Sequence, residues 1–583
     1  MTGDDTNGRT PGNKSSPVSA FVADEDATQI LTPAMTAALR GAMAPPSERA
    51  DPKPEPKPKS EPKSKSEPKP DGARAGPAHA AIAPLREAVL SGRFVSERHQ
   101  DAAARLAALL APRELAAAEF LESWFGTGAV IDLLRDRDRL RGAIDRDIAA
   151  IDARLGAMID AILHAPRLRR LEASWRALSW LGDHIGPASR LKLKVLNVAW
   201  PELCRDLERA AEFDQSQAFR HIYEDEFGMP GGEPYGLLLL DYEIRHRPDA
   251  GAPTDDVSAV ASLSGIAAAA FAPMVINAAP ALFGVDAFAE LSGVADPAGP
   301  FAAVDYGRWR GLALREDVRF MAVSLPRLLV RPLWDEIVPP RRGFHYRERI
   351  NAAAERNWAG ACYAVAACVM RAFDNHGWPA DMRGYESDRE GGGIVGDLPQ
   401  EPFSTDIADG MPRPSIEVIL TDRQERNLID AGFMPLMGLP YGGEIVLGAA
   451  RSLQTAQRYS GSGSGSANSN AKLSAQFNTM VCVSRFAHYV KVMGRDMVGA
   501  FLPAETIQQR LSHWLLHYTN ANLGAGADSM ARYPLVSSSV RVSEMAGKPG
   551  AFRCEINLQP QFQLDDISAS FRLLTELAAP GAS

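Results

Sequence analysis

The segment from Leu163 to Leu181 reads LHAPRLRRLEASWRALSWL, and its spacing of apolar residues constrains the fold more than any other feature of the chain. The residues that recur at steps of three and four, and so share one helix face, are Leu168, Leu171, Trp175, Leu178 and Leu181. The arginines lie mostly off that stripe. An amphipathic helix gains most of its stability by packing its apolar face. The segment therefore predicts a helix whose stripe faces a core supplied by the rest of the chain.

The composition sets the broad class of the protein. The chain has 583 residues, of which 45% are hydrophobic, so it can bury a large core and is long enough for several domains. Its net charge of −9 gives no field that would attract nucleic acid. The five cysteines are scattered without a CxxC pair, which is typical of free thiols in a reducing compartment.

The sequence also bears on membrane insertion and location. The N-terminus lacks the cationic and apolar regions of a secretory signal. Prolines interrupt the longest apolar run, Val257 to Val285, which we interpret as a buried helix ending near Phe271 and a loop. We therefore expect a cytoplasmic protein that neither binds nucleic acid nor inserts into a membrane.

Residues 1–80 form no core of their own. Asp51 to Pro70 reads DPKPEPKPKSEPKSKSEPKP, with no large apolar side chain. Proline removes amide donors and favours extended polyproline II, so this stretch is a stiff, solvated spacer. Ala23 to Met43 has weak helical character, which leaves open a short docking helix beside the favoured unstructured tail. The composition predicts a disordered Pro/Lys-rich tail over 1–80.

The folded sequence changes character after Trp180. Residues 81–185 have helical patterns and form a helical N-terminal region. Leu191 to Val198 alternates apolar and lysine side chains before a short apolar end, which predicts a strand. The continuous run Tyr235 to Tyr242 predicts a strand covered on both faces. Further predicted strands are Phe320–Leu325, Ile416–Leu420 and Glu444–Leu447. Strands that alternate with helices, such as Ile350–Phe373, predict an α/β (mixed α+β) core with a largely parallel sheet over 186–460.

The last part of the chain begins with a Gly/Ser loop at 461–470, which we interpret as a tolerated surface insertion. Residues 471–583 then predict two helices, Leu473–Met497 and Glu505–Tyr518. A hairpin of Val536–Val542 with Phe552–Leu558 and a terminal strand at Phe562–Leu574 follow. Extended segments near a terminus suit β-addition between subunits, so we expect this region to link subunits.

Several local patterns suggest chemistry but lack its context. Gly391-x-Gly393-x-x-Gly396 matches a dinucleotide fingerprint, yet polar residues precede it and no helix follows. His513 and His517 have the spacing of a zinc-binding pair without the glutamate of HExxH. Cys362 and Cys368, six apart on a helix, point to different sides and are expected in the core. We therefore predict no catalytic residue, no cofactor and no metal site.

Two alternatives remain open at this stage. The acidic run Tyr223 to Phe227 is expected to be a solvated loop, with a cation site as the less favoured interpretation. An enzyme whose pocket assembles from distant positions is also compatible with the missing motifs.

A series of motifs along most of the chain forms the pattern of a known family. The matching blocks, in order between Arg139 and Leu577, are Leu171-Glu172-x-x-Trp175-Arg176, Phe219 to Gly228, Pro234 to Leu238, Ala272 to Phe283, Arg319-Phe320, Leu325-Pro326-Arg327-Leu328-Leu329, Asn357-Trp358-Ala359-x-Ala361-x-Tyr363-Ala364, Gly377-Trp378, Arg383-Gly384, Asp430-Ala431-Gly432-Phe433-x-Pro435-Leu436 and Ser484-Arg485-Phe486-Ala487-His488-Tyr489-x-Lys491-Val492. The last block is the most specific. Together the blocks resemble the large subunit of the type VI secretion contractile sheath, the TssC/VipB family. Val330 to Trp334 departs from the family's Leu-Pro-Tyr-Gly turn.

The resemblance implies a sheath-subunit-like core and a mechanical role. Such a subunit pairs with a small sheath subunit (TssB-like) and forms a helical polymer around an inner tube of Hcp-like rings, assembled on a baseplate. The sheath contracts to expel the tube, and an AAA+ unfoldase recycles it indirectly. The departure at Val330 to Trp334 and the N-terminal extension leave open an accessory paralogue that does not form the main sheath.

The resemblance also selects candidate interface residues. They are Leu171, Glu172, Trp175, Arg176, Arg327, Trp358, Arg485, Phe486, His488, Tyr489 and Lys491. For Arg485, His488, Tyr489 and Lys491, helical spacing is equally compatible with subunit contacts and with contacts inside one chain.

Overall fold

The computed structural model describes residues 85–92, 104, 106–107, 117–187, 189–229, 231–335, 343–385, 391–402, 412–439, 443–456, 460, 468, 471, 474–499, 502–522, 526–545, 551–560 and 571–577. The predicted tail over 1–80 and nearly all of the Gly/Ser loop at 461–470 lie outside these residues.

The N-terminal region is helical. Its helices are α2 (Leu85–Leu90), α4 (Ala117–Phe125), α5 (Thr127–Leu134), α6 (Arg137–Leu163) and α7 (Pro166–Asp183). Asp147 on α6 joins three of them, because its carboxylate accepts Arg86 Nε at 2.7 Å from α2 and Trp124 Nε1 at 2.9 Å from α4. This buried polar contact fixes α2 and α4 against one side of α6.

The segment predicted as one helix from Leu163 is divided in the structure. Helix α6 ends at Leu163, and α7 begins at Pro166, whose missing amide is tolerated only in a first helical turn. The prediction that the whole stripe faces a core is also wrong. Leu181 is fully buried, but Leu171 and Trp175 are 55% and 56% exposed. The buried face of α7 runs through small residues instead, with Ala173 and Ala177 beside Leu181.

A six-stranded sheet forms the centre of the protein. Its order is β1-β2-β3-β9-β10-β6. The strands are β1 (Leu238–Ile244), β2 (Met274–Ala278), β3 (Met321–Leu325), β9 (Phe433–Gly438), β10 (Ile445–Leu447) and β6 (Ile394–Val395). The first four are parallel, and β10 is antiparallel to both β9 and β6. The mixed α/β class predicted from the sequence is confirmed.

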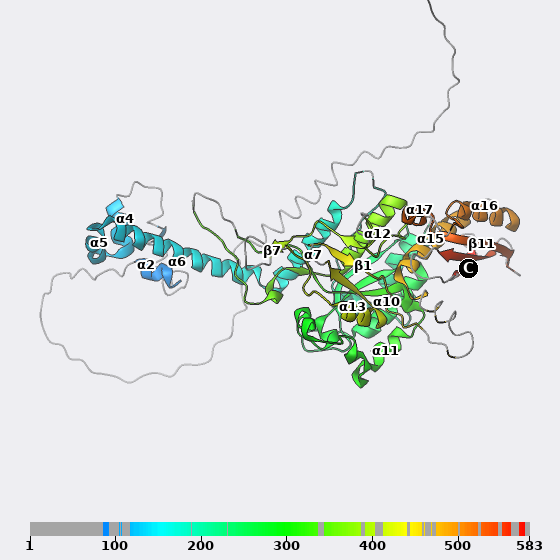
Figure 1. Ribbon diagram of the computed structural model, residues 1–583, viewed down its shortest axis with the longest axis horizontal. Coiled ribbons are helices and arrows are strands. Elements are labelled where there is room, and N and C mark those ends of the chain that lie inside the picture. Colours follow the sequence, from blue (N-terminus) through cyan, green and yellow to red (C-terminus); the bar gives the residue numbers. More distant parts are fainter. Residues whose placement is uncertain are drawn as a thin grey trace, which may run out of the picture. The chain divides into compact units, whose positions relative to one another are not determined.

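Helices cover both faces of this sheet. Met274 and Ile276 pack with α10 (Asp256–Ala270), whereas Val275, which lies between them in β2, packs with α12 (Cys362–His376) and α7. This alternation follows from the period of two in a strand. Figure 1 shows α12 and α10 on either side of β1. None of the helices that the structure describes is both long and apolar enough to cross a membrane.

Shorter elements surround the sheet. They are α8 (Trp200–Arg209), α9 (Gln217–Phe219), the π-helix η4 (Arg220–Gly228), α11 (Gly307–Ala313), α13 (Asp422–Asp430), β4 (Leu328–Leu329), β5 (Trp358–Ala359), β7 (Glu401–Pro402) and β8 (Pro412–Arg413), with 3-10 turns at Phe213–Gln215, Pro280–Phe283, Phe288–Gly293, Gly299–Ala302, Val304–Tyr306, Asp317–Phe320 and Ala353–Glu355. The acidic run Tyr223 to Phe227, predicted as a loop, lies inside η4. Its helical form is explained by aromatic packing, since Tyr223 stacks on Phe219 at 4.8 Å and contacts Phe227 at 5.3 Å between ring centroids.

Three strand predictions need correction. Ile416 to Leu420 is largely buried, but among the described residues it forms a single isolated bridge, from Ile416 to Leu328, and no ladder. Leu191 to Val198 is extended, yet it belongs to no described ladder. The strand predicted at Tyr235 to Tyr242 begins at Leu238 and is half-buried rather than covered, because it is an edge strand.

The C-terminal part packs helices against a second, antiparallel sheet of order β11-β12-β13. Its elements are α15 (Phe477–Gly499), α16 (Ala504–Leu516), α17 (Ala527–Arg532), β11 (Leu535–Glu544), β12 (Phe552–Pro560) and β13 (Phe571–Leu577). The predicted hairpin is confirmed, with Val540 opposite Ile556. Of the terminal strand predicted at Phe562–Leu574, residues 562–570 lie outside the described residues, and the described part forms β13 from Phe571. The core between helices and sheet includes Phe486, Leu511, Leu515 and Ile556.

Candidate functional site

The inner side of α7 is held by a buried group of polar residues, which we call the Glu172 network. Its members are Glu172, Arg176, Arg331, Glu348 and Asn357. Arg331 is 5% exposed and donates to two carboxylates, to Glu172 Oε1 at 2.8 Å and to Glu348 Oε2 at 2.6 Å. Asn357 Nδ2 donates to Glu172 Oε2 at 2.6 Å, and Arg176 Nε donates to Oε1 at 2.7 Å. Both oxygens of the motif residue Glu172 are therefore engaged within this chain.

The charges in this network are set by their partners. Burial alone would raise the pKa of Glu348, but hydrogen bonds from Arg331, the Trp334 amide and His164 outweigh burial and lower it. Burial also opposes the charge of Arg331, and its bonds to Glu348 and Glu172 hold the pKa of the guanidinium above its ordinary value. His164 lies in the turn between α6 and α7, and its Nε2 is 3.1 Å from Glu348 Oε1. The network therefore fixes the start of α7 to the segment 331–357.

Two further polar links tie β1 to its surroundings. Asp241 Oδ2 accepts the Ser174 hydroxyl of α7 at 2.5 Å and the Tyr363 hydroxyl of α12 at 3.0 Å. Burial raises the pKa of Asp241, and the two hydroxyl donors offset this only in part. These contacts hold the edge strand against the two helices that cover its face.

Arg327 supplies the second link. Its guanidinium binds Glu243 of β1 through two bonds, Nε to Oε1 at 2.5 Å and Nη2 to Oε2 at 2.9 Å. It also donates to Glu417 Oε2 at 3.3 Å and lies 5.5 Å from the centre of the Phe288 ring. Burial raises the pKa of Glu417 despite the nearby guanidinium. Arg327 thus joins the edge strand to the segment that contains Ile416.

The most specific motif block lies on α15, and several of its side chains make contacts within this chain. Phe486 is fully buried and stacks on Trp378 with ring centroids 4.1 Å apart. His488 is 3.0 Å from the Ala270 carbonyl at the end of α10, and burial lowers its pKa to about 4. The ammonium of Lys491 lies 3.7 Å from the Phe227 ring centre and bonds the Tyr223 hydroxyl at 3.1 Å. Tyr489 is 36% exposed and receives Arg485 Nη2 at 3.4 Å.

The outer side of α7 is apolar and open. Leu171 and Trp175 lie there, and Trp334, 40% exposed, adds a third large side chain. The Trp334 ring lies 5.9 Å from the Arg176 guanidinium and 5.7 Å from that of Arg331, which connects this surface to the Glu172 network. Trp358, the other candidate near this region, donates Nε1 to the Ala353 carbonyl at 2.8 Å.

Helix α6 bears a longer exposed stripe, which we call the α6 stripe. Its members, with the exposed fraction of each, are Ile144 (37%), Ile148 (40%), Leu155 (39%), Met158 (51%) and Ile162 (61%), together with half-buried Ile151. The steps along this series are four, three, four, three and four residues, the a/d spacing of a coiled-coil seam. Helices α2, α4 and α5 contact α6 elsewhere, through Ala143, Asp147 and neighbouring positions.

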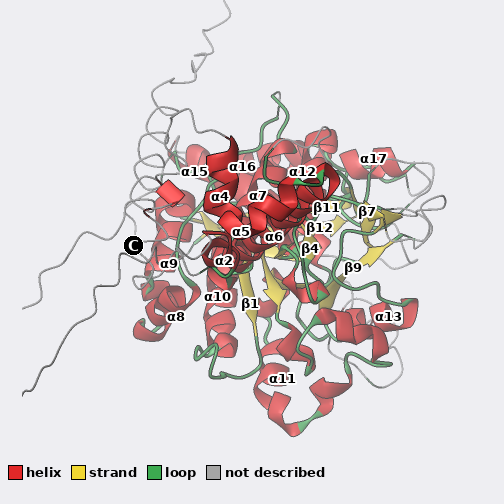
Figure 2. Ribbon diagram, turned by 90° about the vertical axis from the view of Figure 1, so that its left-hand side faces the viewer, coloured by secondary structure: helices red, strands yellow, loops and turns green. Residues whose placement is uncertain are grey.

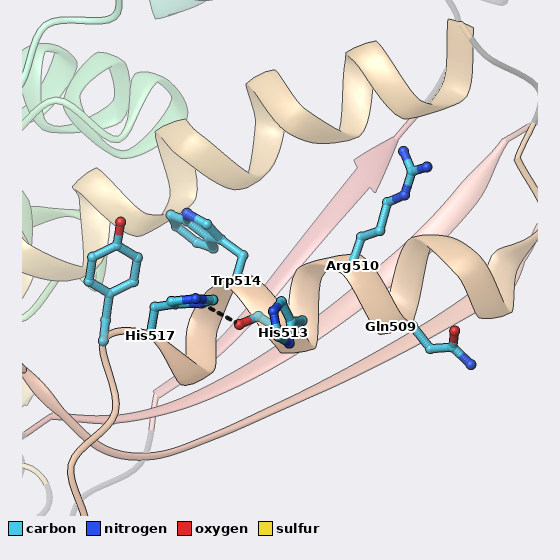
Figure 3. A pocket seen from close by; sticks show the side chains of 6 residues that line it. Gln509, Arg510, His513, Trp514 and His517 are labelled. Atoms are coloured by element: carbon cyan, nitrogen blue, oxygen red, sulfur yellow. Dashed lines mark hydrogen bonds between the residues drawn. The ribbon is translucent and has the colours of Figure 1, made fainter. Parts of the chain in front are cut away.

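A shallow groove of about 530 Å³ lies on α16, lined by Gln509, Arg510, His513, Trp514, His517 and Tyr518 (Figure 3). Trp514 extends toward α15, where it contacts Phe486 and Tyr489. His517 Nδ1 donates to the His513 carbonyl at 2.8 Å, so this ring is tied to its own helix rather than paired with His513 around an ion. Within the described ranges, no three histidine, cysteine or acidic side chains come together as metal ligands would.

The glycine motif at 391–396 has a packing role. Gly391 to Gly396 runs through the short strand β6 and opens no helix. A Cβ atom on Gly393 would lie 2.1 Å from the Leu447 carbonyl oxygen, so glycine is needed for the approach of β10. Cys362 and Cys368 are both buried in α12, and burial raises the pKa of each thiol. The glycines at 391–396 and the two cysteines of α12 therefore have packing roles in the core.

Sequence reasoning missed the partners of Glu172 and the role of Asp241. Arg331 and Asn357 lie far from Glu172 along the chain, so no local pattern connects them. For Asp241 a signal existed, because a carboxylate inside the apolar run LLLLDY requires buried donors.

The comparisons with known proteins agree with this architecture. The EvpB/VC_A0108 tail sheath N-terminal domain matches residues 145–454, and the tail sheath gpW/gp25-like domain of the same family matches residues 466–577. The type VI secretion system sheath protein TssC1 of Pseudomonas aeruginosa (strain PAO1) is 32% identical over 500 residues, 84% of this chain and 98% of that protein.

A cryo-EM structure of the anti-feeding prophage baseplate is also similar over 67% of this chain and 80% of that chain. Its TM-score of 0.28 and sequence identity of 11% are too low to support any argument. The family matches, by contrast, span both the central sheet and the C-terminal sheet. The chain therefore belongs to the large-subunit family of the type VI secretion contractile sheath, the family of TssC and VipB.

Proposed function

We propose that this structural subunit pairs with a small sheath subunit (TssB-like), and that the pair polymerises into a helical sheath around an inner tube of Hcp-like rings. By the same inference, the sheath assembles on a baseplate in the cytoplasm, contracts to expel the tube, and is then recycled by an AAA+ unfoldase. Contraction would exchange one packing of subunit interfaces for another, because packed interfaces are bistable rather than elastic.

The observation that supports pairing best is the α6 stripe. Five of its six apolar side chains are between 37% and 61% exposed, and their a/d spacing fits a second helix. Burying each large aliphatic side chain contributes about 1.5–3 kcal/mol, so leaving the stripe in water is unfavourable for the lone chain. A helix of the small subunit would cover it. Asp145, which is exposed and flanks the stripe, would favour a basic residue on that helix.

The test is co-expression with the small subunit encoded nearby, followed by affinity purification and negative-stain electron microscopy. Hollow tubes are the expected product. Leu155→Asp places a charge in the stripe and is expected to reduce recovery of the small subunit more than tenfold. Ala150→Asp, also on α6 but off the stripe, is the matched control and should pair normally.

Different failures have different meanings. Normal pairing by Leu155→Asp would reject the α6 stripe as the contact while leaving the sheath proposal intact. Discrete particles instead of tubes from the unmodified chain would reject a main-sheath role and favour the accessory paralogue.

A further inference from the structure

The groove on α16 combines aromatic and basic side chains. Trp514 and Tyr518 are half-buried and supply its apolar surface. Arg510, His513 and His517 are exposed along the same groove. Figure 3 shows Arg510 and Trp514 projecting from the side of α16 that faces α15. The groove therefore offers an apolar contact surface beside a guanidinium.

Positive charge continues onto α15, which lies next to α16 (Figure 2). The Arg485 guanidinium lies 4.7 Å from the centre of the Tyr489 ring, and the centre of that ring lies 5.9 Å from that of Trp514. The two helices carry one acidic residue each, Asp496 and Glu505, both near the connection between the helices. The aromatic groove is thus flanked by arginines, in a chain whose net charge is −9.

This combination of groups fits an acidic peptide that also carries an aromatic side chain. Carboxylates form strong, charge-assisted hydrogen bonds with a guanidinium. Aromatic rings pack favourably against one another, either offset face to face or edge to face. A nucleic acid is a poor alternative, because the negative net charge of the chain repels a polyanion.

One segment of this chain has the required composition, and we call Phe21–Leu31 the acidic segment. It contains three successive carboxylates, Asp24–Asp26, and residues 15–39 include no basic side chain. Phe21 is the only phenylalanine, tyrosine or tryptophan in residues 1–80. The acidic segment lies outside the described residues and outside both ranges that match the sheath family. Membership of the family therefore assigns it no role.

We propose that the α16 groove binds the acidic segment of the same chain. Phe21 packs against Trp514, and Asp24–Asp26 accepts hydrogen bonds from Arg510. Residues 32–84 connect the segment to α2, and a proline-rich stretch as long as 51–70 can by itself extend to roughly 60 Å, so the connection is long enough. Because a tether raises the local concentration of a segment, a weak contact suffices. This inference goes beyond the proposed function and is measured without the small subunit.

Photocrosslinking in the full-length chain tests the contact directly. Benzoylphenylalanine, a photocrosslinking residue, is incorporated in place of Phe21, and the crosslinked peptides are identified by mass spectrometry at a low chain concentration. The main crosslink is expected within one chain, to the peptide that contains Trp514 and Tyr518. The same probe in place of Ser60, in the Pro/Lys stretch, is the matched control and should crosslink to that peptide at least tenfold less.

Charge reversal tests the ionic part of the contact. Arg510→Glu is expected to lower the crosslink yield at least fivefold, because it places a further carboxylate beside the three of the acidic segment. Arg532→Glu, at an exposed position of α17 outside the groove, is the control and should leave the yield unchanged. Asp24→Lys, Glu25→Lys and Asp26→Lys together should also lower the yield. Combining them with Arg510→Glu should restore part of it.

Melting temperatures equal to that of the unmodified chain would show that the variants fold, so that a lost crosslink reports on the contact. A yield that Arg510→Glu leaves unchanged, or a main crosslink outside α15 and α16, would overturn the proposal. Crosslinks that join isotope-labelled to unlabelled chains in a mixture would overturn it as well, because the occupant of the groove would then be a second copy.

Discussion

Arg331→Met is the most informative perturbation of the Glu172 network, because it removes the cation from between two carboxylates. Glu348 is 1% exposed, so the substitution leaves a buried carboxylate without its guanidinium. Breaking a buried pair in this way costs about 3–5 kcal/mol. The Trp334 amide at 3.0 Å and His164 at 3.1 Å still bond Glu348, which places the expected loss near the lower end, about 3 kcal/mol.

The expected loss depends on pH in a defined direction. In the native chain the pKa of Glu348 is lowered, so its ionised carboxylate stabilises the fold at neutral pH. This stabilisation is lost as the pH falls from the ordinary glutamate pKa through the lowered pKa of Glu348. Without Arg331, burial should raise the pKa of Glu348. Protonation of Glu348 as the pH falls then removes the buried charge that destabilises the variant. The stability difference between variant and native chain should therefore shrink between pH 7.5 and pH 5.

Urea denaturation followed by tryptophan fluorescence measures the effect. A loss of about 3 kcal/mol lowers the urea midpoint by about 1 M for a slope of about 3 kcal/mol/M. Arg331→Lys keeps the charge but not the forked geometry and should lose less. Adding Glu348→Gln to Arg331→Met removes the orphaned charge and should recover part of the loss. An unchanged midpoint for Arg331→Met, or no recovery in the double variant, would refute the reasoning.

Further predictions concern a buried and an exposed apolar residue of α7, a buried histidine and the buried thiols. Leu181→Ala leaves a cavity at a fully buried position and should lower the free energy of unfolding, measured by denaturation, by about 2–5 kcal/mol. Trp175 is more than half exposed, so Trp175→Ala should leave the stability of the lone chain nearly unchanged but reduce assembly into tubes. Burial lowers the pKa of His488 to about 4, so the free energy of unfolding should fall by up to about 3 kcal/mol between pH 6.5 and pH 4. His488→Gln should remove this part of the pH dependence of stability. A variant with the same pH profile as the native chain would contradict the assignment. All five cysteines are buried, and burial raises the pKa of each thiol, so a thiol reagent should modify none in the native chain and all five after unfolding.

Patterns of apolar residues predicted the parts of the fold that are stabilised within the chain. The alternating helices and buried strands indicated a mixed α/β core, and the hairpin of β11 and β12 followed from two runs separated by a glycine-rich turn. The Glu172 network escaped prediction for a physical reason. Ion pairs have no periodicity, and Arg331 reaches Glu172 across 159 positions of the chain. Sequence identified Glu172 only as part of a resemblance, and the structure supplied its partners.

Two of the incorrect predictions have a common physical origin. A stripe such as Leu171 and Trp175, or an alternation such as Leu191 to Val198, predicts an apolar contact or a paired strand. It does not indicate whether the contact comes from the same chain or from another. The lone chain leaves Trp175 56% exposed and Val195 63% exposed, at places where the same patterns predicted a core and a ladder. The Glu172 network and the Asp241 link hold α7 and β1 in place behind these surfaces. An interface that must withstand contraction requires rigid backing, because a surface that yields cannot transmit force. The buried charges of the Glu172 network and the exposed Leu171 and Trp175 therefore lie on opposite sides of α7.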